Sequence, residues 1–92
     1  MAEETVKHKI KANVFSIENG HVQFENVKAV RIISDKYNIL IMEDYLPVIG
    51  EVKGNVSIVL DDSTEEFNNI TGYYKHSHNQ FELLIKGYDN VA

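Results

Sequence analysis

Two histidines separated by one residue, His76 and His78, are the side chains best placed along this sequence to hold a metal ion. In an extended strand, residues two apart point to the same face, so the two imidazoles would lie side by side. Asp61 or Asp62 from a neighbouring strand would supply a third ligand, but a metal site needs three or four oriented ligands and only two are visible here. An exposed hairpin end explains the same residues, and we favour that interpretation.

The other candidates for chemistry are single histidines and paired carboxylates. His8 lies on the apolar face of an expected strand and His21 follows a turn, so both are interpreted as structural. The acidic pairs are Glu43-Asp44, Asp61-Asp62 and Glu65-Glu66. They stand in polar turns, whereas a glycosidase needs two carboxylates at a fixed separation with one of them buried. The sequence also lacks a glycine-rich phosphate loop, a nucleophile elbow and a His-Glu-x-x-His motif, so we expect neither an enzyme nor a cofactor.

Aromatic residues are more numerous than a core of this size can enclose, with five tyrosines and four phenylalanines. Tyr73 and Tyr74 are neighbours in an expected strand, so one ring should point into the core and the other outward. Exposed tyrosines are favoured at protein interfaces, but they also cover sheet edges with the hydroxyl in water. From the residues alone, the two interpretations carry equal weight.

The composition is that of an ordinary globular domain with one core: 92 residues, of which 43% are hydrophobic and 25% charged. A net charge of -5 argues against a nucleic-acid partner, and the absence of cysteine excludes disulfides and thiolate chemistry. No apolar run approaches the ~20 residues that cross a bilayer, and the N-terminus lacks the pattern of a signal peptide. We therefore expect a cytoplasmic protein with a single domain over residues 1–92, frayed at residues 1–5 and 88–92.

Apolar residues repeat mainly with a period of two, which is typical of strands with one solvated face. Residues 6–14, 56–60 and 81–86 alternate in this way, and Asn19-Gly20 is a strong hairpin signal. Residues 38–42 are almost wholly apolar and predict a strand that is buried on both faces or crosses between sheets. Pro47 and Gly50 predict an irregular crossover with at most one short turn over residues 43–51. Turns every ~8–12 residues predict an all-β sandwich of about eight to ten short, mainly antiparallel strands. The expected core residues are Ile10, Val14, Val30, Ile32, Leu40, Val56, Ile58, Leu83 and Ile85.

Several stretches, in the order in which they occur, resemble one family. Residues 27–34 begin with Val-x-x-Val and lead through a turn to the apolar segment 38–49, in which Pro47 falls on a proline of the family; the alignment has no gap from Val27 to Val52. Further along the chain, Lys53-Gly54 corresponds to a Lys-Pro-Gly of the family, and residues 55–60 correspond to the strand that follows it. Residues 70–74 resemble a family strand that ends in Ser-Gly-Gly-Phe, and residues 79–85 resemble the last strand. Upstream, residues 9–24 correspond to the first hairpin. The pattern is similar to the N-terminal β-sandwich of the epsilon subunit of rotary, F-type ATP synthases.

The resemblance implies an assembly role. In that family the sandwich clamps onto the gamma subunit of the central stalk, and the turn that corresponds to residues 35–38 faces the membrane rotor ring. Asn38 replaces a glutamate of the family and Tyr45 replaces a histidine, whereas Gly72 keeps a small residue where the chain bends or passes close to a neighbour. The sequence ends after the last sandwich strand, where the family continues into a helical hairpin, so we expect neither nucleotide binding nor ATPase inhibition.

The leading hypothesis is that the protein is a non-enzymatic module for protein interaction, whose partner is a gamma-like stalk subunit. We expect that it binds no nucleic acid and does not insert into a membrane, but lies at the periphery of a membrane complex. The predicted contact residues are Tyr37, Asn38, Tyr45 and Tyr73, with Tyr37 and Tyr45 presented to solvent by the loop 35–45. The alternative is a small-ligand or carbohydrate-binding β module that uses the exposed tyrosines. An enzyme, or a metal protein using His76 and His78, ranks third.

Overall fold

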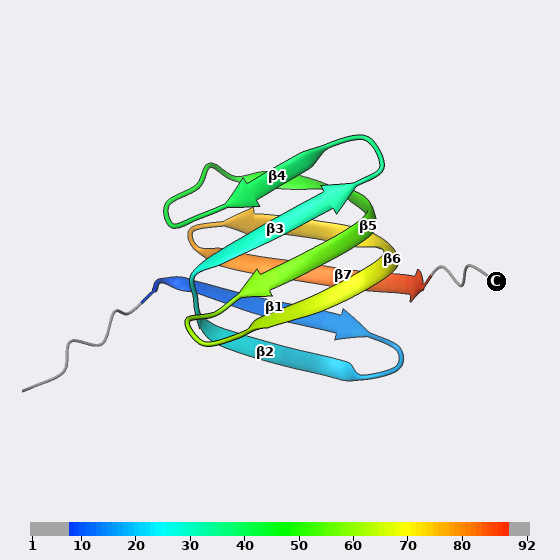
Figure 1. Ribbon diagram of the computed structural model, residues 1–92, viewed down its shortest axis with the longest axis horizontal. Helices are drawn as coiled ribbons and strands as arrows, with labels where there is room; N and C mark the ends of the chain where they lie inside the picture. Colours follow the sequence, from blue (N-terminus) through cyan, green and yellow to red (C-terminus); the bar gives the residue numbers. More distant parts are fainter. Residues whose placement is uncertain (1–7, 89–92) are drawn as a thin grey trace, which may run out of the picture.

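The computed structural model describes residues 8–88, which form a single mixed sheet of seven strands in the order β2-β1-β7-β6-β5-β3-β4 (Figure 1). The strands are β1 (Ile10–Ser16), β2 (Gly20–Val27), β3 (Ala29–Ser34), β4 (Asn38–Ile41), β5 (Val48–Val59), β6 (Thr64–Ser77) and β7 (Gln80–Tyr88). All neighbouring strands are antiparallel except β1 and β7, which are parallel. The prediction of an all-β, mainly antiparallel fold is therefore confirmed.

Seven strands are present in residues 8–88 instead of eight to ten, because β5 and β6 are long. They contain 12 and 14 residues. The irregular crossover predicted for residues 43–51 is confined to residues 42–47, with a turn at Glu43-Asp44, and residues 48–51 belong to β5 instead. Pro47 stands immediately before this strand, where its missing N–H costs no ladder hydrogen bond.

The two long strands bend and fold the sheet onto itself, as their curved course in Figure 1 shows. The pairing register shifts between Gly54 and Val56 in β5, and between Thr71 and Gly72 in β6. At both bends a glycine allows a close backbone approach, since a Cβ on Gly54 would meet the carbonyl oxygen of Ile33 and a Cβ on Gly72 that of Leu84. Such bulges increase local twist, which is how a single hydrogen-bonded sheet closes around one core.

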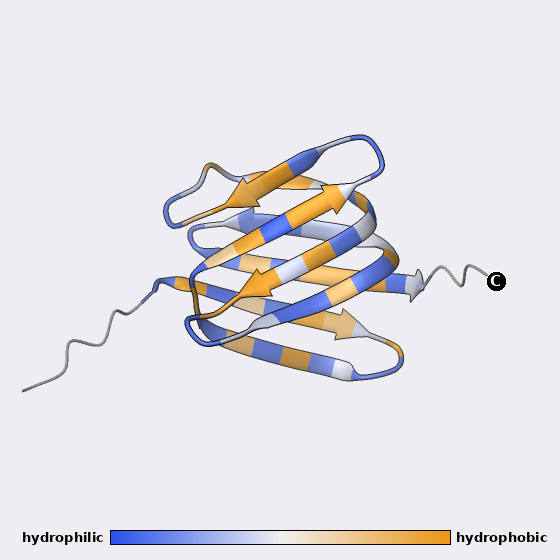
Figure 2. Ribbon diagram, in the orientation of Figure 1, coloured by the Kyte–Doolittle hydropathy of each residue, from blue (hydrophilic) through white to orange (hydrophobic). Residues whose placement is uncertain are grey.

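The core lies between the two halves of the folded sheet, and alternating hydrophobic and hydrophilic bands mark its strands in Figure 2. Its buried hydrophobic residues are Ile10, Ala12, Val14, Val27, Ala29, Val30, Ile32, Ile41, Val52, Val56, Ile58, Ile70, Tyr74, Phe81, Leu83 and Ile85. Of the predicted core residues, only Leu40 is misplaced, with 42% of its surface exposed. The prediction that its strand is buried on both faces was wrong because β4 is an edge strand that pairs only with β3 and keeps one solvated face.

Two hairpins show the local rules that connect these strands. Asn19-Gly20 lies at the β1–β2 turn as predicted, and Gly20 has a φ of 69°. His78 and Asn79 form the two-residue turn between β6 and β7 with φ values of 50° and 60°, the left-handed conformation that a tight hairpin requires at both positions. Of the residues expected to fray, Tyr88 is the last residue of β7, and the others lie outside the described residues.

Candidate functional site

The two histidines proposed as metal ligands lie in different environments. His76 is 1% exposed on β6, where it pairs with Val48 and its ring lies 6.3 Å from that of Phe81. His78 is exposed in the hairpin turn, so the two-residue periodicity that would bring the imidazoles together ends before it. The interpretation as an exposed hairpin end therefore fits His78 and is wrong for His76. Within residues 8–88 there is no group of three or more His, Asp or Glu side chains that could hold a metal ion.

Neither ring nitrogen of His76 has a hydrogen-bond partner among residues 8–88. Burial lowers the pKa of His76 from its ordinary value, because removal from water disfavours the charged form. A neutral imidazole with unpartnered nitrogens among apolar neighbours contributes volume to the core and costs polar desolvation.

Because His76 is buried in its neutral form, we expect the protein to lose stability in mild acid. The unfolded chain takes up a proton at His76 near pH 6.5 while the native chain does not, so the free energy of unfolding should fall as the pH drops through and below about 6.5. Urea unfolding of the wild type and of His76→Phe between pH 7.5 and 5 measures this effect, since the variant lacks the titrating group. Equal pH dependence in the two proteins would contradict the prediction.

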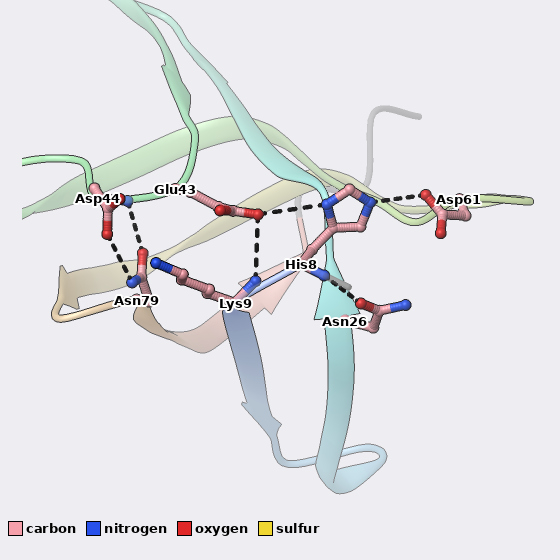
Figure 3. A network of polar contacts seen from close by, with 7 residues as sticks. All are labelled: His8, Lys9, Asn26, Glu43, Asp44, Asp61 and Asn79. Carbon is pink, nitrogen blue, oxygen red and sulfur yellow. Dashed lines mark hydrogen bonds and ion pairs between the residues drawn. The ribbon is translucent and has the colours of Figure 1, made fainter. Parts of the chain in front are cut away.

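His8 belongs to a polar network that connects several loops (Figure 3). Its Nε2 lies 2.8 Å from Asp61 Oδ1 and its Nδ1 lies 3.5 Å from Glu43 Oε2, while its backbone N–H donates to Asn26 Oδ1 at 2.5 Å. The two carboxylates contact opposite nitrogens of the ring, so they do not converge on one point. This geometry supports the structural interpretation of His8.

The same network includes the turn between β6 and β7. The backbone N–H of Asp44 donates to Asn79 Oδ1 at 2.8 Å, and Asn79 Nδ2 donates to Asp44 Oδ1 at 3.2 Å (Figure 3). These contacts attach the crossover of residues 42–47 to the hairpin that follows β6. The side chains of Glu43 and Asp44 thus connect the crossover to neighbouring loops.

Tyr37 is held by hydrogen bonds to the sheet and is only partly accessible to solvent, whereas the sequence predicted that the loop presents it to solvent. Its hydroxyl donates to the backbone carbonyl of Glu51 and lies 2.9 Å from the hydroxyl of Tyr74. Burial, followed by the hydrogen bond with Tyr37, raises the pKa of Tyr74 above its ordinary value. Gly50 makes room for this arrangement, because a Cβ there would come within 2.7 Å of the Tyr74 hydroxyl oxygen. Tyr37 is therefore half-buried and joins the β3–β4 turn to the sheet.

The other predicted contact residues are accessible to solvent. Asn38 is exposed as the first residue of β4, Tyr45 is 37% exposed in the crossover, and Tyr73 is 42% exposed on β6. Tyr73 points outward while Tyr74 is 4% exposed, which confirms that these neighbours face opposite ways.

A row of apolar side chains crosses the outer face of the sheet around Tyr73. Phe15 on β1 pairs with Leu84 on β7, and Leu84 pairs with Tyr73 on β6. Ile49 on β5 lies beside them, because it lines the same shallow depression as the other three. We call these four residues the outer row; their exposed fractions lie between 36% for Phe15 and 78% for Ile49.

Charged and aromatic residues lie beside the outer row. Lys86 Nζ lies 5.1 Å from the centre of the Tyr73 ring, and the ring of Phe15 stacks on His21 with centres 4.5 Å apart. Lys75 Nζ and Glu82 Oε1 form a solvent-exposed ion pair at 4.0 Å on the same face. An apolar centre with a polar rim is the usual composition of a protein interface.

Sequence reasoning found Tyr73 but missed the rest of the outer row. The available signal was a break in the alternation: Leu83 and Leu84 are adjacent, so one of them must point outward. Phe15 and Ile49 are likewise large apolar residues at solvent-facing positions of their strands. An exposed apolar group that spans several strands is more informative than any single exposed side chain.

Next to the outer row, a hollow of about 540 Å³ opens between the β3–β4 turn and the first half of β5. Its lining includes Tyr37, Tyr73 and Tyr74, with Ile39 and Val48 as apolar neighbours. The volume falls in the range of ligand pockets, about 300–1,000 Å³.

Comparison with known proteins identifies a shared fold and no family. No family model and no curated protein sequence matches this chain. Among solved structures, it is similar to a chain in the cryo-EM structure of the central stalk and c-ring of the Tetrahymena thermophila mitochondrial ATP synthase. The TM-score is 0.69 with 14% sequence identity, over 92% of this chain and 67% of that chain. The β fold is thus one that occurs in a rotary ATP synthase. The sequence resemblance predicted a fold of this kind.

Residues 8–88 contain no helix of the length and apolarity needed to cross a membrane.

Proposed function

We propose that this protein is a non-enzymatic assembly module that docks onto a subunit of the central stalk of a rotary ATP synthase, in the manner of the epsilon sandwich. The observation that carries the proposal is the structural similarity to a chain of an ATP synthase stalk and c-ring structure over 92% of the present chain. The order of sequence features that resembles the epsilon family points to the same role independently.

The outer row is the surface we assign to this contact. It offers large apolar side chains on four neighbouring strands, which is a rigid platform against which a helical partner such as gamma can pack. Tyr73 contributes a stiff aromatic surface with a polar tip, and aromatic residues near the centre of an interface commonly carry much of its binding energy. Asn38 and Tyr45 do not line the depression of the outer row, and we assign them no central part in the contact.

Binding to the gamma subunit of the same host tests the proposal. The double variant Tyr73→Ala/Leu84→Ala should weaken binding by about 2 kcal/mol or more, roughly 30-fold, because it removes the centre of the outer row. Leu40→Ala is the matched control, since Leu40 is similarly exposed on β4 and lies outside the row. Titration calorimetry measures both affinities, and urea unfolding verifies that the variants stay folded.

Two results would contradict the proposal. If the wild type does not bind gamma at micromolar concentration, the stalk role is wrong. If gamma binds and Leu40→Ala weakens the complex as much as the double variant does, the outer row is not the contact.

The second candidate is a small-ligand module, favoured by the hollow with three tyrosines in its lining. Ligand pockets are commonly lined by aromatic side chains, and an aromatic ring can pack against the apolar C–H face of a sugar ring. A glycan array with the wild type tests this function. Selective binding there, together with no affinity for gamma, would replace the assembly role.

A further inference from the structure

The first half of β5 has a strand neighbour on one side only. Residues 48–53 pair with β6, from Val48 opposite His76 to Lys53 opposite Thr71. The pairing of β3 with β5 begins at Gly54, and β4 pairs with β3 alone. Within residues 8–88, the second edge of this half-strand therefore has no strand beside it.

The backbone groups on that edge can be identified from Lys53. Its N–H donates to Ser34 Oγ and its carbonyl accepts from the N–H of Asp35, both at 3.0 Å, so Lys53 faces away from β6. Because backbone groups alternate in direction along a strand, Glu51 and Ile49 face the same way. The carbonyl of Glu51 accepts from the Tyr37 hydroxyl, which agrees with this assignment.

Three backbone groups remain on the edge without a hydrogen-bond partner in the described part of the chain. They are the N–H and the carbonyl of Ile49 and the N–H of Glu51. Pro47 ends the free edge on one side, and the attachment of Lys53 to the β3–β4 turn ends it on the other. Proteins usually blunt an exposed edge because it pairs with other chains; here the exposed stretch is short and bounded.

The hollow described above borders this edge and supplies side-chain contacts. Ile39 and Val48 provide apolar surface, while Lys36, Lys53 and Lys86 line it together with only two carboxylates, Asp35 and Glu51. This local excess of positive charge occurs in a chain whose net charge is -5. A ligand that fits both the backbone groups and the charge is a negatively charged segment of extended peptide.

We propose that the free edge of β5 at Ile49 and Glu51 binds an extended acidic segment of a partner protein as an added strand. Main-chain hydrogen bonds to Ile49 and Glu51 hold the segment, and its alternate side chains enter the hollow and meet the lysines. This inference does not rest on the proposed function. Ile49 and Tyr73 border both sites, but the outer row acts through side chains on the face of the sheet, whereas this site acts through backbone groups on its edge.

Selection from a phage library of random decapeptides against the wild-type protein tests the proposal. Acidic sequences with alternating apolar residues should be enriched. Ile49→Pro should weaken the selected peptides at least about tenfold, because it removes one edge N–H that does not serve the pairing with β6. Ile49→Val is the matched control and should bind within about twofold, since it keeps the N–H and most of the side chain.

N-methylation of the peptides gives a readout that needs no variant. A strand donates N–H groups to one side only at every second residue, so methylating one alternate set should abolish binding and methylating the other should not. Binding should also persist in Phe15→Ala/Leu84→Ala, because these two residues of the outer row do not line the hollow, and this result would separate the site from the outer row.

Three outcomes would overturn the proposal: no enrichment of any peptide, enriched peptides that tolerate both methylated sets, or a wild type that sediments as a dimer and excludes peptide. The last result would assign the edge to a second copy of the chain. If Ile49→Pro does not fold, the methylated peptides still decide the question.

Discussion

Replacing Gly72 with valine is expected to lower the free energy of unfolding by about 3 kcal/mol, since overpacking of a close contact commonly costs ~1–3 kcal/mol and here the obstacle is backbone. A Cβ at this position would collide with the carbonyl oxygen of Leu84 in β7. That oxygen belongs to the ladder between β6 and β7 and cannot rotate away as a side chain would. The register shift at Thr71 and Gly72 would have to move, and with it the bend of β6.

Gly87 on the partner strand supplies the control. A Cβ there meets nothing within 4 Å, so Gly87→Val should change the stability by no more than a typical surface substitution, about ±0.5 kcal/mol. Urea unfolding monitored by circular dichroism measures both variants. Equal midpoints for Gly72→Val and the wild type would show that the two strands are not in close contact at this point.

Alternation in the sequence was sufficient to predict which side of most strands faces the core. It correctly placed Ile10 and Val14 on β1 and Leu83 and Ile85 on β7, because each of these strands has one buried face and a period of two. It failed at Leu40, where a run of apolar residues was interpreted as a strand buried on both faces. The run occurs at an edge of the sheet, and a position within a sheet depends on strand order, which local periodicity does not encode.

The candidate sites were less predictable because they depend on long-range contacts. The hydroxyl of Tyr37 contacts the backbone of Glu51, 14 residues away, and the side chain of Tyr74, 37 residues away. Nothing in the composition of the β3–β4 turn indicates these partners, so the turn was expected to present Tyr37 to solvent. The free edge of β5 could not be predicted from the pattern of side chains either, since it consists of backbone groups that the bend at Gly54 leaves unpaired.

His76 shows a different limit of sequence reasoning. In the sequence it resembles half of a metal-binding pair, and in the structure it is a core residue between Val48 and Phe81. The two-residue spacing to His78 has no geometric meaning, because the hairpin turn begins between them. Spacing rules apply only within one regular element. The interpretation as an exposed hairpin end correctly indicated that a strand ends here, but it did not indicate that His76 still belongs to the buried part of β6.

Phe81→Ala is expected to cost about 3–5 kcal/mol, the usual loss for a fully buried phenylalanine. Phe81 is 0% exposed, and its ring lies 6.1 Å from that of Tyr74 and 6.3 Å from that of His76. Phe15→Ala is the control: this ring is 36% exposed, stacks on His21, and should cost much less. Urea unfolding at pH 7.5 compares the two, and similar losses would contradict the placement of Phe81 in the core.

The same variant should also change the response to acid. Removing the Phe81 ring leaves a cavity beside His76, and the unpartnered ring nitrogens of His76 offer hydrogen bonds to water that enters it. Hydration relieves the burial that lowers the pKa of His76, so the native pKa should move back toward its ordinary value near 6.5. The difference in proton uptake between native and unfolded chains then shrinks, and the free energy of unfolding should fall less between pH 7.5 and 5 than it does in the wild type. A Phe81→Ala protein that loses stability in acid as steeply as the wild type would mean that His76 stays dry or that its burial is not what lowers its pKa.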